Sequence, residues 1–169
     1  MTTDHNKLLP LAELLLPDDA TLKQEVDLAI KQPAHYVSRF QERLRRRGIG
    51  EAVPALPWLA LIDGLQARGS VVEIDWREAP DDVVMSVDRL LVNLPADPKR
   101  WAWVEMDVWE ESPTEDFLKE IGERLTAQGW VLAFFNTQSD SYPLTLLRLE
   151  QLEFVQQLAA QAGYGIMRP

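Results

Sequence analysis

The segment "PALPWLALIDGLQARG" constrains the fold of this chain more than any other. Its central part, Pro57–Leu65, is apolar nearly all round the helix that it predicts, and Asp63 is the exception. A helix of that kind must be covered on most of its sides. Directly after the helix stop at Gly69, the β-rich run "SVVEIDW" predicts a strand. The chain therefore has to bury a helix and also build a sheet.

The first third of the chain is predicted to be helical. An apolar run within residues 1–17 favours a short helix or an arm. Asp18 or Asp19 can cap a second helix, whose apolar residues follow a helical stripe. A further helix is predicted to begin at Pro33, which suits a first turn, and to stop at Gly48.

Helical and strand patterns alternate in the rest of the chain. "PDDVVMSVDRLLVNL" has helical spacing, and Ser112 with Glu115 predicts a capping box for the helix that follows. "WVLAFF" and "YPLTLLR" predict two strands, which the polar loop "NTQSDS" joins. A last helix then leads to "YGIMR", which predicts a short edge strand.

This order of elements predicts an α+β fold. We expect a mixed sheet of about four to five strands packed by about six helices, with a helical N-terminal third. The chain has 169 residues, of which 46% are hydrophobic, and this is long enough for one well-developed core. A single domain over residues 1–169 is therefore predicted.

The composition bears on the compartment, because the chain contains no cysteine. Disulfides and thiolate metal sites are therefore excluded, and a reducing cytoplasm suits such a composition. The apolar run near the N-terminus is interrupted by Pro10, Glu13 and Pro17, so it is too short to span a bilayer. It also lacks the basic leader of a secretory signal. We expect a cytoplasmic protein with no membrane association.

The net charge of −10 is unevenly distributed along the chain. Residues 1–50 carry eight basic and seven acidic side chains, whereas residues 51–169 carry nine basic and twenty acidic ones. Such an acidic body repels nucleic acid and speeds the encounter with a basic protein. The alternative interpretation is that the acidity only keeps the protein soluble. The basic run "RFQERLRRRG" is predicted to pair with the acidic body or to stay solvated.

Few residues in the chain suit catalysis or metal binding. The two histidines, His5 and His35, have no paired-ligand spacing, and most nucleophile–base arrangements lack their parts. We therefore predict no catalytic residue, no metal site and no cofactor. The alternative is a metal-dependent, carboxylate-based hydrolase or phosphoryl-processing enzyme, in which Asp75, Glu78 and Asp140 would hold magnesium.

Asp63 is predicted to be a buried polar residue. A carboxylate in an apolar helix is costly unless it is paired or hydrogen-bonded. A structural role is therefore predicted, with a bond to loop backbone or to an arginine such as Arg68 or Arg77. A further hypothesis is a small-molecule pocket beside Asp63 and Trp76.

The segment "WAWVEMDVWEE" combines large rings with carboxylates. If it is a strand, alternation places one set of residues on the face opposite the core: Trp101, Trp103, Glu105, Asp107 and Trp109. That face suits the recognition of a basic protein surface, because tryptophan is a frequent interface anchor. The alternative is that the rings pack beneath a helix of the same chain.

The segments "LALIDGLQARGSVVEIDW" and "GWVLAFFNTQSDSYPLTLL" resemble signatures of a bacterial family known only as a domain of unknown function. The resemblance covers roughly residues 20–168. It rests on a glycine, an aromatic residue, a short strand and a loop that ends in "SDSY", which are Gly129, Trp130 and 139–142 here. The resemblance implies no activity and no cofactor. The compact acidic α+β form is also similar in type to bacterial immunity proteins.

Together these features favour a non-enzymatic cytosolic protein that binds another protein. Its most specific form is immunity-type neutralisation of a basic toxin. The expected partner is a basic protein, with no role for nucleic acid or membrane, and the chain is expected to be a monomer or a homodimer.

Overall fold

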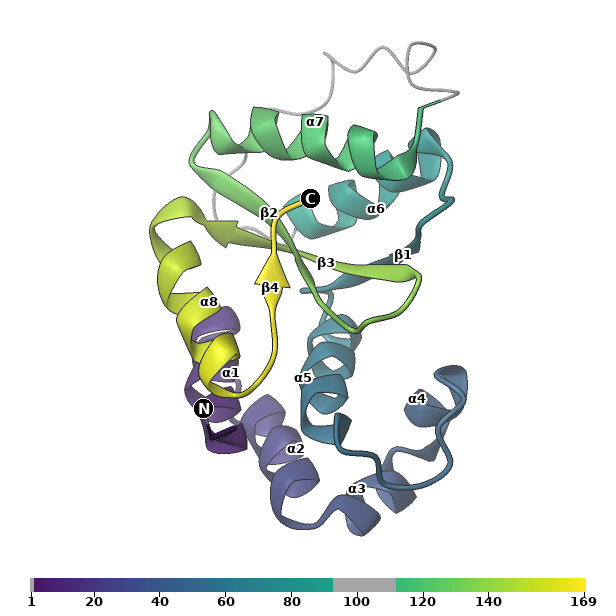
Figure 1. Ribbon diagram of the computed structural model, residues 1–169, viewed down its shortest axis with the longest axis vertical. Coiled ribbons are helices and arrows are strands. Elements are labelled where there is room, and N and C mark those ends of the chain that lie inside the picture. Colours follow the sequence, from purple (N-terminus) through teal and green to yellow (C-terminus); the bar gives the residue numbers. More distant parts are fainter. Residues whose placement is uncertain (1, 93–111) are drawn as a thin grey trace. The chain divides into compact units, whose positions relative to one another are not determined.

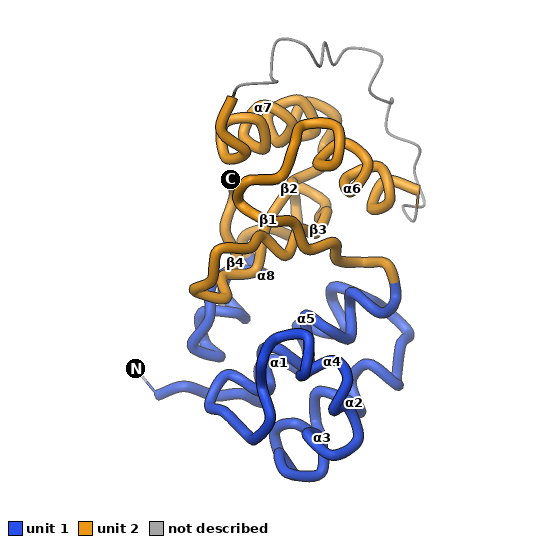
Figure 2. The backbone as a smooth tube through the Cα atoms, turned by 90° about the vertical axis from the view of Figure 1, so that its right-hand side faces the viewer, with its two compact units in different colours: residues 1–68, 154–165 blue, residues 69–153, 166–169 orange. Residues whose placement is uncertain are grey.

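The computed structural model describes residues 2–92 and 112–169 (Figure 1). It contains helices and a four-stranded sheet, which confirms the α+β class. The chain divides into two compact units, which Figure 2 shows in different colours. Unit 1 comprises residues 1–68 and 154–165, and unit 2 comprises residues 69–153 and 166–169. In the described part of the chain, no helix is long and apolar enough to cross a membrane.

Unit 1 is helical, as predicted for the first third of the chain. Its helices are α1 (Leu8–Leu15), α2 (Ala20–Lys31), α3 (Pro33–Arg39), α4 (Gln41–Arg46), α5 (Leu56–Ala67) and most of α8 (Leu152–Gln161). Asp19 caps α2, because its carboxylate accepts a hydrogen bond of 2.8 Å from the Leu22 N–H. All ten residues of α5 from Leu56 to Leu65 are buried. The nearly uniform apolar pattern of this segment is thereby explained.

The predicted single helix from Pro33 to Gly48 is wrong, because the chain forms α3 and α4 instead. Phe40 separates them with non-helical backbone angles of φ −114° and ψ 34°. The centres of the Phe40 and Tyr36 rings are 4.6 Å apart, and the Arg43 guanidinium lies 4.4 Å from the centre of the Phe40 ring. The spacing of apolar residues did not reveal this break, because Phe40 lies on the same apolar stripe as Tyr36 and Leu44 and so fits an unbroken helix.

Tyr36 makes the stability of unit 1 depend on pH in the alkaline range. Its side chain is fully buried, and burial raises its pKa to about 12. An unfolded chain releases this proton near pH 10 while the fold retains it, so stability falls as pH rises from 10 to 12. The difference in free energy of unfolding between Tyr36→Phe and wild type should therefore move in favour of the variant by about 1 kcal/mol between pH 9 and pH 11. Urea unfolding at both pH values tests this, and an unchanged difference would contradict it.

Unit 2 contains the sheet, and each strand lies where the sequence predicts one. Its elements are β1 (Val72–Asp75), α6 (Pro80–Val92), α7 (Thr114–Thr126), β2 (Trp130–Phe135), β3 (Ser141–Arg148) and β4 (Ile166–Met167). The strand order is β1-β3-β2-β4. Asp75 pairs with Ser141, and Trp130 pairs with Arg148.

A mixed sheet was predicted, whereas all three strand pairs in the described part of the chain are antiparallel. β2 and β3 form a hairpin, and β1 pairs with the other edge of β3. β1 and β2 therefore run in the same direction with β3 between them. The alternation of helices and strands suggested parallel neighbours, but the insertion of β3 leaves only antiparallel contacts.

Helices α6 and α7 cover one face of this sheet (Figure 1). Their shared core includes Val87, Phe117, Ile121, Leu132 and Leu144. The predicted capping box at Ser112 is wrong, because Pro113 occupies the N-cap position and no side chain caps the helix.

The first residue of α7 contacts the chain beyond β1. The Thr114 hydroxyl donates a hydrogen bond of 3.0 Å to the Glu78 carbonyl. Thr114 is itself buried. The start of α7 is therefore fixed against the segment that follows β1.

Candidate functional site

The predicted aromatic and acidic face lies outside the described residues. This holds for all five of its members: Trp101, Trp103, Glu105, Asp107 and Trp109. The face therefore stays a prediction.

A hollow of about 240 Å³ lies in unit 2 at the loop between β2 and β3. Its lining combines rings, hydroxyls and one carboxylate: Trp76, Phe134, Phe135, Asn136, Thr137, Ser139, Asp140, Ser141 and Tyr142. The polar loop "NTQSDS" thus joins with the residue after β1 to make a concave surface. We take this hollow as the candidate functional site.

Backbone hydrogen bonds hold the loop in shape. Gln138 adopts a left-handed conformation with φ 57°, and its N–H donates to the Asn136 side-chain oxygen over 3.0 Å. The backbone N–H of Trp76 donates to the backbone carbonyl of Asp140 over 3.1 Å. Trp76 and Asp140 are therefore neighbours, although 64 positions separate them in the chain.

Aromatic side chains form one wall of the hollow. The rings of Phe134 and Tyr142 meet edge to face, with centres 5.2 Å apart. Burial, and then the charge of Glu115, raises the pKa of Tyr142. The Trp76 side chain is 46% exposed, and the Arg77 guanidinium lies 4.2 Å from its ring centre. The exposed indole thus already holds one cation.

A chain of hydroxyl groups leads from the hollow to a carboxylate. Ser141 donates a hydrogen bond of 2.6 Å to Glu73 Oε1. The hydroxyls of Ser139 and Ser141 are 3.1 Å apart, and those of Thr137 and Ser139 are 2.7 Å apart. The loop is therefore ordered by side-chain contacts as well as by its backbone.

The structure does not gather the predicted magnesium ligands. Asp75 accepts a hydrogen bond of 2.8 Å from the Arg77 N–H, and Glu78 accepts one of 3.2 Å from the Asp75 N–H. These two carboxylates shape the turn after β1, while Asp140 lines the hollow. Over residues 2–92 and 112–169, no group of three or more histidine or carboxylate side chains could hold a metal ion.

Asp63 is buried, but its arginine partner differs from the predicted ones. The Arg47 guanidinium donates to Asp63 Oδ1 over 2.9 Å from Nε and 2.6 Å from a terminal nitrogen. An arginine does pair with Asp63, but it is neither Arg68 nor Arg77, which were the two examples named. Asp63 is also not among the residues that line the hollow beside Trp76.

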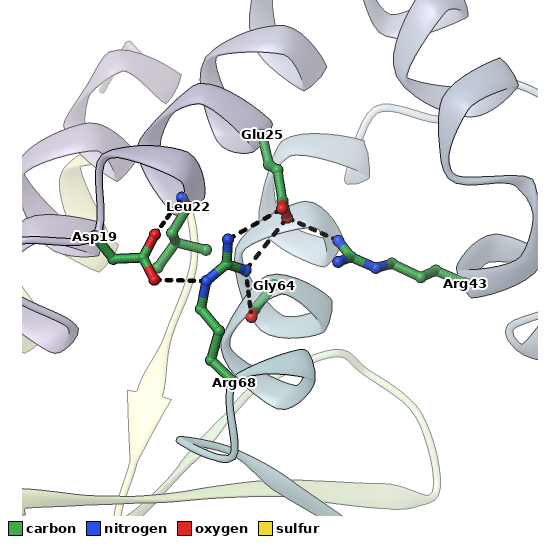
Figure 3. Close-up of polar contacts among 6 residues, drawn as sticks. All are labelled: Asp19, Leu22, Glu25, Arg43, Gly64 and Arg68. Atoms are coloured by element: carbon green, nitrogen blue, oxygen red, sulfur yellow. Dashed lines mark hydrogen bonds and ion pairs between the residues drawn. The ribbon is translucent and has the colours of Figure 1, made fainter.

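Arg68 instead joins a network of ion pairs in unit 1 (Figure 3). It donates to Asp19 over 2.7 Å, to Glu25 over 3.1 Å and to the Gly64 carbonyl over 2.8 Å. Glu25 also accepts a hydrogen bond of 2.8 Å from Arg43. The Leu22 N–H, and then Arg68, lower the pKa of the Asp19 carboxyl. The network ties α2 to α4 and α5, so its role is structural.

Sequence reasoning missed Glu25, which is 7% exposed. Its position offered a signal, because it lies on the same helical stripe as Leu22 and Ala29. Gly64 faces this stripe closely: a β-carbon there would stand 2.5 Å from Leu22 Cδ1. A charged residue on an apolar stripe therefore marked a buried ion pair.

Comparison with known proteins identifies the family of the chain. No curated protein matches it, and neither does any solved structure. A family described as "Domain of unknown function" (DUF6630) matches residues 7–169, which is nearly the whole chain. The chain therefore belongs to this family, as its "SDSY" loop and the strands beside it suggested.

Proposed function

We propose that this protein acts without catalysis, by binding a basic protein through unit 2. The observation that carries the proposal is the division of charge between the units. Unit 1 contains nine acidic and nine basic side chains, whereas unit 2 contains eighteen acidic and eight basic ones. The whole net charge of −10 therefore falls on unit 2.

The basic residues of unit 1 are balanced by an equal number of acidic ones, so they do not offset the net charge of unit 2. Arg43, Arg47 and Arg68 each form ion pairs within unit 1. The acidic field of unit 2 would attract a basic surface from a distance and raise the rate of association. Immunity-type neutralisation of a basic toxin is the most specific form of the proposal. A cytoplasmic location, where such a partner would be met, belongs to it as well.

Charge reversal tests this proposal. Glu105→Lys with Asp107→Lys should slow association with the partner about fivefold at low salt, since this is a long-range effect on the encounter rate. The partner is first captured from an extract of the source organism and identified by mass spectrometry. Association rates are then measured by surface plasmon resonance at low and high salt.

A matched control reverses two exposed charges of unit 1. Glu42→Lys with Glu51→Lys changes the net charge by the same amount, and it should slow association far less. Equal effects of the two pairs, a partner of acidic composition, or rates that do not respond to salt would each overturn the proposal.

A further inference from the structure

The hydroxyl chain of the hollow has a fixed direction. Ser141 donates its single hydroxyl proton to Glu73, so it has no proton left for Ser139. Ser139 must then donate to Ser141, and Thr137 must donate to Ser139. All three protons are therefore committed toward Glu73. The oxygens of these hydroxyls have only lone pairs left to offer to a ligand.

Asp140 adds a charged acceptor to the same hollow. Its backbone carbonyl is held by the Trp76 N–H, while its side chain makes no hydrogen bond or ion pair with the residues that the structure describes. Trp76 lies in the same lining and is 46% exposed, and an indole ring favours cations. Arg77 demonstrates this preference, because its guanidinium lies over the Trp76 ring.

We propose that this hollow receives an arginine side chain of the basic partner. A guanidinium is planar, so it can stack on the face of the Trp76 ring opposite Arg77 while its N–H groups reach Asp140 and the hydroxyl oxygens. An ammonium group makes point contacts and does not stack in this way. The volume of about 240 Å³ suits one side chain and not a folded segment. The inference rests on the proposed function for the existence of the partner, but the site can be tested without it.

The test uses three short peptides and the full chain labelled with ¹⁵N. They are acetyl-Gly-Arg-Gly-amide and its counterparts with lysine or with citrulline, which is a neutral analogue of arginine. The arginine peptide should shift the Trp76 indole resonance and the amides of residues 139–142, with a Kd on the order of 1 mM. Lysine should bind about threefold more weakly and citrulline at least about tenfold more weakly. Trp76→Phe identifies the indole resonance by its loss.

Two matched variants separate the hollow from the general acidity of unit 2. Asp140→Asn should weaken binding of the arginine peptide about fivefold or more. Glu150→Gln removes the same charge beyond the opposite end of β3 and should leave the Kd unchanged. Amide spectra of both variants away from the hollow show whether they are folded. Equal binding of citrulline, equal effects of the two variants, or shifts confined to other regions would overturn the inference.

The outcome also separates this inference from the proposed function. In one outcome, high salt and the charge reversal of Glu105 and Asp107 both slow association with the partner, while Asp140→Asn changes neither the association nor the dissociation rate. The arginine site in the hollow is then rejected and the proposed function stands. If the arginine peptide binds at the hollow but no basic partner shows salt-dependent association, the hollow stands and the proposed function fails.

Discussion

Replacing Trp58 by alanine is expected to lower the free energy of unfolding of unit 1 by about 4 kcal/mol. Trp58 belongs to α5 and is 1% exposed. Its ring stacks on that of Tyr164, with centres 4.7 Å apart and planes within 1° of parallel. Truncation therefore removes a large buried surface and an aromatic contact together.

This stack also joins distant parts of the chain within unit 1. The Tyr164 hydroxyl lies 3.2 Å from His5 Nε2, so losing its ring partner should loosen the contact with the N-terminal segment. Urea unfolding measures the loss, and hydrogen exchange of α5 amides locates it in unit 1. Trp58→Phe keeps a ring and should lose about half as much or less. A loss below about 1 kcal/mol for the alanine variant would contradict the expectation.

Replacing Glu25 by alanine is expected to cost about 3 kcal/mol, because it leaves two partly buried arginines without their shared partner. Glu25 pairs with Arg43 and Arg68, whose side chains are 25% and 18% exposed. The free energy of unfolding is again measured in urea. Glu42→Ala is the matched control, since the Glu42–Arg46 pair is well exposed and spans 4.0 Å. That control should change stability by less than about 0.5 kcal/mol.

A double-mutant cycle shows whether the effect of Glu25 comes from its ion pairs. Combining Glu25→Ala with Arg68→Ala should cost about 1 kcal/mol less than the two single changes added together. Strict additivity would mean that the carboxylate acts through packing alone. Either result is read from the same unfolding curves.

The buried network also bears on function. The arginine-rich end of α4 would suggest nucleic-acid binding if it were considered alone. Arg43 and Arg47 instead pair with Glu25 and Asp63 inside unit 1. Unit 1 has equal numbers of acidic and basic side chains and is therefore neutral, so the acidity of unit 2 dominates any encounter.

Periodicity predicted most elements correctly because it reflects local requirements. A residue every three to four positions must face a core in a helix, and continuous β-rich runs suit buried strands. This is why α7, β2 and β3 lie where they were expected. The break at Phe40 and the uncapped start of α7 were missed, since neither changes the spacing of apolar residues.

The candidate site was predicted only in fragments. Trp76 and Asp140 were each singled out, but they were assigned to different hypotheses. The pairing of β1 with β3 brings them together, and no local pattern encodes which strand lies next to which. Asp75 and Glu78 instead form local hydrogen bonds in the turn after β1.

The sequence by itself determined the α+β class, the burial of α5, the strand segments and the acidity of the chain. These properties follow from composition and from neighbours within a few positions. Only the tertiary structure decided that Arg47 pairs with Asp63, that Glu25 is buried, and that β3 lies between β1 and β2. Those outcomes depend on contacts between distant segments, where several partners of the same charge or hydrophobicity compete and geometry selects one.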